Sequence, residues 1–119
     1  MRLKIKRAYT EADPGDGTRI LIDRLWPRGV TKEKARIDLW MREIAPSSEL
    51  RKWFGHDPEK WTEFQKRYLD ELKNNQEMVD SILDMAKDGP VTLVYSAKDE
   101  QHNDAIVLLG LLDRKMGGR

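Results

Sequence analysis

Five consecutive residues near the end of this 119-residue chain constrain its fold more than any other feature. Residues 91–95, with the sequence VTLVY, are β-branched, apolar or aromatic and do not alternate between polar and apolar side chains. A strand of this kind needs cover on both faces, which is typical of the centre of a parallel sheet. We therefore predict an α/β fold with helices packed on a mainly parallel sheet. In it, residues 91–95 form a central strand parallel to a second strand over residues 18–23.

The first half of the chain is expected to supply the remaining strands. Residues 2–6 alternate between charged and apolar side chains, which is the period of a half-buried strand. A polar, turn-rich segment separates this strand from the one over residues 18–23. Apolar residues alternate again over residues 37–41 and predict a short third strand, preceded by a helical turn over residues 32–36.

Helices are expected in the middle and at the end of the chain. Ser47 or Ser48 can cap a short helix that Gly55 closes. The next helix has a start signal in Asp57 and Pro58. The residues expected on its buried face are Trp61, Phe64, Tyr68, Leu69 and Leu72. Those expected on the buried face of the following helix, which should stop at Gly89, are Met78, Val79, Ile82, Leu83 and Ala86. The last helix should end at Gly117 and Gly118.

The composition bounds the class of protein. A chain of 119 residues without cysteine predicts one domain that needs no disulfide and carries out no thiol chemistry. The first ten residues are charged and alternating, unlike a signal peptide, and the longest apolar run, residues 105–112, is too short to span a membrane. We therefore expect a cytoplasmic protein. Positive charges exceed negative ones by four over residues 1–60, a bias that suits an anionic ligand or simply a mixed-charge surface.

Polar and aromatic side chains follow the two strands that are expected to be neighbours. The first set comprises Asp23, Arg24, Trp26 and Arg28, and the second comprises Ser96, Lys98, Asp99, His102 and Asn103. Ligands of open α/β sheets bind beyond the carboxyl ends of the strands, so we expect the two sets to converge. Arginines and a helix N-terminus favour a phosphate or a carboxylate.

The sequence therefore predicts an anion pocket. Arg24 and Arg28 should face the loop over residues 96–103, and at least one guanidinium should lie within reach of the N-terminus of the last helix. Trp26 should form an apolar wall. If the protein is an enzyme, the candidate catalytic residues are His102, Asp99 and Ser96, because a neutral imidazole in the first helical turn can act as a base.

Each of these residues also has a structural interpretation. Asp99 or Asn103 can cap the last helix. Asp23 and Arg24 can form an ion pair without any role in binding. Trp26 can fill the core, and Lys98 and His102 can simply face solvent.

Several specific chemistries are absent from the sequence. It contains no glycine-rich phosphate loop, no nucleophile elbow and no HExxH zinc motif. The two histidines lie far apart and no cysteine accompanies them, so neither a metal site nor a cofactor is predicted. The tryptophans at positions 26, 40, 53 and 61 fit core packing better than an aromatic platform for nucleic acid.

Three segments in order along the chain resemble the YeaO-like family, the domain-of-unknown-function family 488. They are RILIDRLWPRGV (19–30), APSSELRKWFGHDPEKWTEF (45–64) and VTLVYSAKDEQHNDAIVL (91–108). The resemblance implies a small bacterial or archaeal cytoplasmic protein with an α/β fold, and it implies no reaction. A longer branch of the family carries cysteines in the last strand-to-helix loop. Here that loop has Ser96 and Asn103 and no cysteine, so thiol chemistry does not carry over.

Three functions fit these observations. The first is an enzyme or a small-molecule binder that acts on a phosphate- or carboxylate-bearing ligand. The second is a nucleic-acid-associated or regulatory module that uses the basic N-terminal half; nothing in the sequence predicts a winged helix with a recognition helix. The third is a protein-interaction domain that uses the Arg/Trp loop, since these residues are enriched in interface hot spots. The sequence leaves the oligomeric state open.

Overall fold

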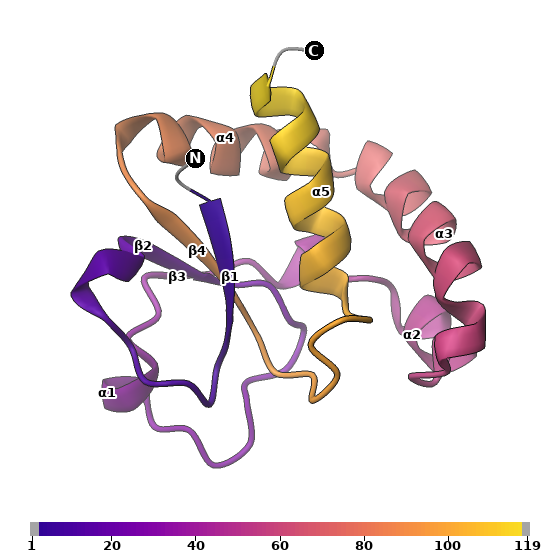
Figure 1. Ribbon diagram of the computed structural model, residues 1–119, viewed down its shortest axis with the longest axis horizontal. Coiled ribbons are helices and arrows are strands. Elements are labelled where there is room, and N and C mark those ends of the chain that lie inside the picture. The colour runs from indigo at the N-terminus through magenta and orange to yellow at the C-terminus, as the bar shows by residue number, and fades with distance from the viewer. Residues whose placement is uncertain (1–2, 118–119) are drawn as a thin grey trace.

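The computed structural model describes residues 3–117. Their central element is a four-stranded parallel sheet (Figure 1). Its strands, in the spatial order β1-β4-β2-β3, are β1 (Leu3–Arg7), β4 (Val91–Tyr95), β2 (Thr18–Leu21) and β3 (Leu39–Trp40). Every neighbouring pair is parallel. β4 lies between β1 and β2, with Ile20 opposite Leu93 in the pairing with β2. The prediction of a central strand parallel to residues 18–23 is confirmed.

Helices fill most of the remaining chain. They are α1 (Lys32–Ala35), α2 (Ser48–Phe54), α3 (Trp61–Lys73), α4 (Gln76–Asp88) and α5 (Asp104–Gly117). Short 3-10 turns occupy Pro14–Asp16, Arg42–Ile44 and Pro58–Lys60. The predicted start and stop signals are confirmed: the Ser47 side chain caps α2, and Gly55 ends it in the left-handed conformation. Gly118, the second expected stop residue of α5, lies outside the described residues.

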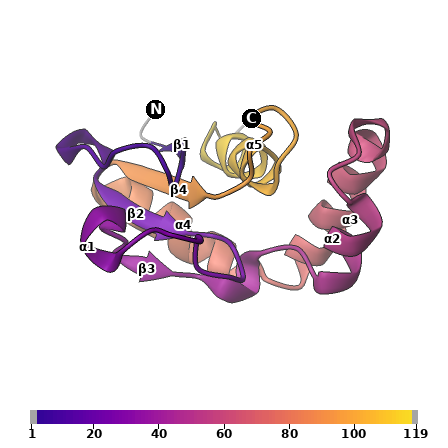
Figure 2. The ribbon, with the colours of Figure 1, turned by 90° about the horizontal axis from the view of Figure 1, so that it is seen from below.

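Helices cover one face of the sheet and form the main core with it. α5 packs on β1 and β4, α4 packs on β4, and α3 packs on the outer side of α5 (Figures 1 and 2). The predicted buried face of α3 is confirmed, because Phe64, Tyr68 and Leu72 are fully buried and Trp61 packs on their edge. The Tyr68 hydroxyl donates to the Ile44 carbonyl at 2.8 Å, which satisfies its polar group inside the core.

Loops and the short α1, rather than long helices, cover the other face of the sheet. Near the carboxyl ends of the strands, Leu21 and Val94 lie in a small apolar cluster against Trp26 and Trp40. The two indole rings meet edge to face, with their centroids 5.5 Å apart. β4 is therefore buried on both faces, as its sequence predicts, although no long helix lies on this side.

The strand boundaries depart from the prediction in two places. β2 ends at Leu21 rather than at residue 23, although the Ile22 N–H still donates to the Val94 carbonyl at 3.1 Å. β3 keeps only two residues, and Leu39 is 38% exposed instead of buried. The reason is that β3 lies at the edge of the sheet, where one side of the strand has no neighbouring strand to cover its apolar side chains.

No helix among the described residues is both long and apolar enough to cross a bilayer.

Candidate functional site

The carboxyl ends of β2 and β4 are joined through Asp23 and Ser96. Both the backbone N–H and the hydroxyl of Ser96 donate to Asp23 Oδ2, at 2.9 and 2.8 Å. The backbone of Asp23 is fixed from the other face of the sheet, because Trp40 Nε1 donates to its carbonyl at 2.6 Å. Arg7, at the end of β1, holds the following loop by donating to the Ala97 carbonyl at 2.9 Å. The two loops therefore converge, as the strand order requires.

The N-terminus of α5 points into the same place and is already occupied by the protein's own side chains. Asn103 caps the helix, its Oδ1 accepting from the Ile106 N–H at 3.0 Å. Asp104 Oδ1 accepts from the Ala105 N–H at 2.9 Å. The positive end of a helix dipole favours an anion. Here the carboxyl group of Asp104 takes that position.

Asp104 and Asp23 form a carboxyl pair. Burial and the neighbouring Asp23 carboxylate, which shares a hydrogen bond with Asp104, raise the pKa of Asp104 well above its ordinary value. Two carboxyl groups in contact cannot both ionise easily in a partly desolvated site, so the pair retains a proton where isolated aspartates have lost theirs.

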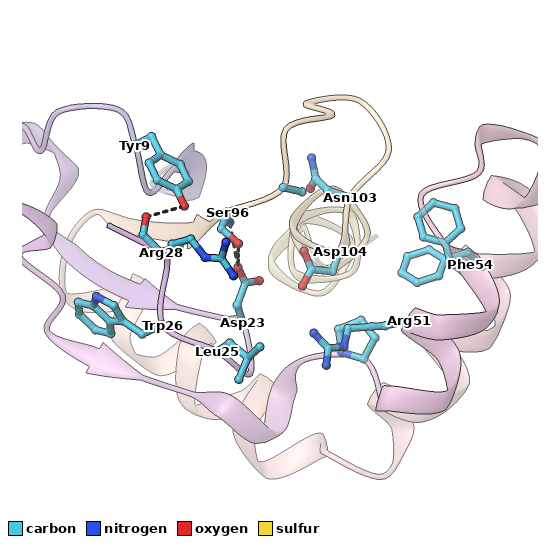
Figure 3. Close-up of a pocket in the computed structure, with 13 residues that line it drawn as sticks. Tyr9, Asp23, Leu25, Trp26, Arg28, Arg51, Phe54, Ser96, Asn103 and Asp104 are labelled. Atoms are coloured by element: carbon cyan, nitrogen blue, oxygen red, sulfur yellow. Dashed lines mark hydrogen bonds between the residues drawn. The ribbon is translucent and has the colours of Figure 1, made fainter. Parts of the chain in front are cut away.

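A pocket of about 400 Å³ lies over this pair (Figure 3). Trp26 and Arg28 from the segment after β2, and Ser96 and Asn103 from the loop after β4, line one part of it. Arg51, Phe54 and Phe64 line another part. Figure 3 shows Asp23 and Asp104 between Arg28 and Arg51, whose side chains approach from different elements.

The α2–α3 pair places Arg51 and the aromatic wall of the pocket. Glu71 on α3 accepts from the N–H and the hydroxyl of Ser47, at 2.8 and 2.6 Å, and this ties the start of α2 to α3. Arg51 and Phe54 are three residues apart, so they share one face of α2. The Phe54 ring stacks on Phe64, with centroids 4.3 Å apart.

Arg28 and Arg51 have guanidinium groups that no other side chain engages. Within residues 3–117, neither group forms an ion pair or a hydrogen bond. The backbone of Arg28 is nevertheless held, because the Tyr9 hydroxyl donates to its carbonyl at 3.0 Å. Two positive charges are thus exposed to the pocket.

The structure brings together five of the predicted site residues and separates the others. Those that line the pocket are Asp23, Trp26, Arg28, Ser96 and Asn103. The prediction that Arg24 faces the 96–103 loop is wrong: its guanidinium donates to the Pro46 carbonyl at 3.0 Å and the Ala45 carbonyl at 3.4 Å. Nor does it pair with Asp23, whose carboxylate binds Ser96 instead. Lys98 is exposed and does not line the pocket.

The other two catalytic candidates form a separate pair beside the pocket. His102 Nδ1 lies 2.9 Å from Asp99 Oδ2, and the His102 N–H donates to Asp99 Oδ1 at 3.0 Å. Hydrogen bonds from the Gln101 N–H and from His102 lower the pKa of Asp99. The imidazole ring meets Trp61 edge to face at 5.2 Å. Neither side chain lines the pocket, so the pair fixes the loop before α5.

Sequence reasoning missed the residues that arrive from other elements. Arg51, Phe54 and Phe64 carry no local signal for a site, because only the docking of α2 and α3 brings them to the strand ends. Asp104 did carry a signal, since an aspartate follows the capping asparagine at the start of an otherwise apolar helix. Among the described residues, no cluster of three or more His, Asp or Glu side chains is placed to hold a metal ion.

The comparisons with known proteins agree on the family. The family model described as the inactive DUF488-N3 subclade matches residues 2–118. This chain belongs to that subclade of the DUF488 family. It is 44% identical over 108 residues to the uncharacterised protein YeaO of Escherichia coli K12, covering 91% of this chain and 94% of YeaO. It is 37% identical over 112 residues to Mb3100c of Mycobacterium bovis and to Rv3073c of Mycobacterium tuberculosis, covering 94% of each chain. No solved structure matches this DUF488 chain significantly.

Proposed function

We propose that this DUF488 protein binds a small ligand with a phosphate or carboxylate group in the pocket between Arg28 and Arg51. One observation supports this proposal above all: both guanidinium groups line the pocket, and neither pairs with another side chain within residues 3–117. Guanidinium groups bind carboxylates and phosphates through parallel hydrogen bonds.

The anion occupies a different place from the one that the sequence suggests. A helix N-terminus is a general anion site, but here Asp104 and Asn103 already accept the Ala105 and Ile106 N–H groups at that position, and Asp23 lies beside Asp104. A ligand anion placed there meets two carboxyl groups. It therefore binds on the arginine side chains at the flanks of the pocket.

Binding without turnover suits the site better than catalysis. Ser96, the one catalytic candidate on the pocket wall, has its hydroxyl hydrogen bonded to Asp23 rather than to a histidine. The matching family model describes its members as inactive, which points the same way. We therefore favour a ligand-binding protein.

A thermal-shift series tests this proposal. Inorganic phosphate, AMP and succinate are added separately at an ionic strength held constant with sodium chloride. At least one of them should raise the melting temperature, because a ligand of the folded state stabilises it by mass action. Arg28→Gln and Arg51→Gln should weaken the response, whereas Lys66→Gln, on the exposed side of α3, should not. If none of the compounds shifts the wild type, or if all variants respond equally, the pocket does not bind anions.

A second candidate function is a protein contact at the rim of the pocket. Leu25, which is 71% exposed, and Tyr9, which is 48% exposed, both line the pocket and offer large side chains to a partner. Trp26, the hot spot that the sequence suggests, packs inward on Trp40 instead. Self-association measured by sedimentation over a range of concentrations, and abolished in Leu25→Ser, would favour this candidate over small-molecule binding.

A further inference from the structure

The pocket contains both positive and negative side chains, and this combination limits the kinds of ligand that can satisfy all of them. The carboxyl pair of Asp23 and Asp104 lies between Arg28 and Arg51, so negative and positive groups occur side by side within one cavity (Figure 3). A simple inorganic anion uses the arginines and makes no favourable contact with the carboxyl pair. A ligand that also carries a hydrogen-bond donor or a positive charge uses both.

The pocket also has an apolar side. Leu25, which is 71% exposed, lines the same cavity as Arg51, together with the nearly buried rings of Phe54 and Phe64, which stack at 4.3 Å. A volume of about 400 Å³ lies within the range of small-molecule sites, about 300–1,000 Å³. The pocket therefore offers three kinds of contact: guanidinium, carboxyl and apolar.

We propose that the ligand is a zwitterionic α-amino acid with an apolar side chain. Its ammonium group lies on Asp23 and Asp104, its carboxylate binds the guanidinium of Arg28 or Arg51, and its side chain packs on Leu25 and the edge of Phe54. This inference rests on the proposed function, because the carboxylate is the anionic group that the arginines bind. It adds a requirement for an amine on the same molecule.

The charge of the carboxyl pair agrees with a single ammonium group. Burial and the Asp23 carboxylate raise the pKa of Asp104, so the pair carries close to one negative charge while the shared proton remains. One ammonium group neutralises that charge and donates up to three hydrogen bonds. Without a ligand, Asp104 accepts backbone hydrogen bonds at the start of α5, from the Ala105 N–H among them, and contacts Asp23.

Three compounds with one side chain separate this inference from the proposed function. L-phenylalanine carries both charged groups, 3-phenylpropionate lacks the amine, and phenethylamine lacks the carboxylate. Their dissociation constants are measured by isothermal titration calorimetry on the full-length protein at pH 7. L-phenylalanine should bind at least tenfold more tightly than either analogue.

The variants assign each charged group to its partner. The double variant Asp23→Asn/Asp104→Asn removes the negative charge of the pair, so it should weaken the binding of L-phenylalanine at least tenfold and leave that of 3-phenylpropionate within threefold. Arg51→Gln and Arg28→Gln, singly or together, should weaken both ligands. Lys66→Gln is the matched control and should change neither. Should the double variant fail to fold, the three-compound series on the wild type decides the question alone.

The outcomes distinguish the two proposals. If 3-phenylpropionate binds as tightly as L-phenylalanine, the pocket takes anions and the amino-acid inference is overturned while the proposed function stands. If phenethylamine binds as tightly as L-phenylalanine and the arginine variants have no effect, both are overturned. Absence of binding by all three compounds overturns the amino-acid inference. If phosphate, AMP and succinate also fail to bind, the proposed function is overturned with it.

Discussion

Two clusters of charged residues flank the sheet, and they differ in whether their acidic and basic groups form ion pairs. In the first, the carboxylate of Asp16 is fully buried and pairs with Lys4 at 2.8 Å, Lys6 at 2.9 Å and Arg19 at 2.7 Å. In the second, Asp23 and Asp104 share a pocket with Arg28 and Arg51 without any ion pair between the two kinds of group. Both contain acidic and basic side chains, but only in the first do the opposite charges form ion pairs.

The difference shows in the two aspartate pKa values. Burial raises the pKa of Asp16, but hydrogen bonds from Lys4, Lys6, the Asp13 N–H and Arg19 outweigh it and hold the pKa well below its ordinary value of 3.8. Burial and the neighbouring Asp23 raise the pKa of Asp104 with no cation to compensate. The Asp16 cluster therefore stabilises the fold, whereas the pocket holds charges that the fold does not need.

The largest effect is expected on removing the Asp16 charge. Asp16→Asn leaves Arg19, which is 3% exposed, without its ion pair, and breaking a buried pair in this way costs about 3–5 kcal/mol. The free energy of unfolding from urea titration at pH 7 measures this. The stabilisation is fully present above pH 3.8 and is lost as the pH falls through the lower pKa of the folded state, so wild type and variant should converge in acid.

Asp70→Asn is the control for that measurement. Asp70 pairs with Lys73 at 3.3 Å, but both side chains are more than 70% exposed. Exposed pairs contribute about 0–1 kcal/mol. A loss at Asp16 no larger than the loss at Asp70 would contradict the assignment of the Asp16 cluster to stability.

A smaller loss of stability is expected at Ser96, which lines the pocket and also forms a hydrogen bond with Asp23. Ser96→Ala removes the 2.8 Å hydrogen bond to Asp23 but leaves the backbone N–H bond in place. The loss should be about 1 kcal/mol, measured by urea titration, because one hydrogen bond is removed and its acceptor keeps a partner. A loss as large as that of Asp16→Asn would mean that the pocket, too, is a stabilising cluster.

Asp104→Asn should stabilise the protein slightly at alkaline pH. Between the ordinary aspartate pKa and the raised pKa of folded Asp104, the folded state binds more protons than the unfolded state, so wild-type stability falls as the pH rises. Asparagine has no proton to lose, and its side-chain oxygen can still accept from the Ala105 N–H. The urea midpoint of the variant should exceed that of wild type at pH 8, and the difference should vanish below pH 3.8. A lower midpoint at pH 8 would show that Asp104 is ionised and stabilising.

The smallest change in stability is expected at the two free arginines. Arg28→Gln and Arg51→Gln remove guanidinium groups that contact no carboxylate, so the free energy of unfolding should stay within about 0.5 kcal/mol of wild type. The same variants should lose the response to anions in the thermal-shift series. A stability loss of several kcal/mol in either variant would mean that the pocket arginines stabilise the fold, as the Asp16 cluster does.

The sequence predicts the central strand, the helix ends and the buried helix face well, because patterns among neighbouring residues determine them. The unbroken apolar run over residues 91–95 places β4 inside the sheet, and Ser47, Gly55 and Asp57 mark helix ends that the structure confirms. The helical spacing of Phe64, Tyr68 and Leu72 identifies the core face of α3. Each of these features depends on residues that are close together in the chain.

The site is predicted only in part because its other residues depend on tertiary packing. Arg24 and Arg28 look equivalent in the sequence, yet Arg24 turns to the Pro46 carbonyl while Arg28 lines the pocket. Arg51 enters only through the docking of α2 on α3. The Asp16 cluster was missed for the same reason, since a proline- and glycine-rich turn does not reveal that its aspartate is buried under three cations.

The spatial order of the strands also affects how the chain is made. Leu3 in β1 pairs with Val91 in β4, and β4 separates β1 from β2, so the sheet lacks its middle strand until residues 91–95 have been synthesised. Chains grow at about 5–20 residues per second, so β1 waits for several seconds with its backbone unpaired. Contacts this distant in sequence slow folding. The lysines that alternate along β1 keep this early strand soluble during the wait, since charged side chains discourage an unpaired strand from joining another chain.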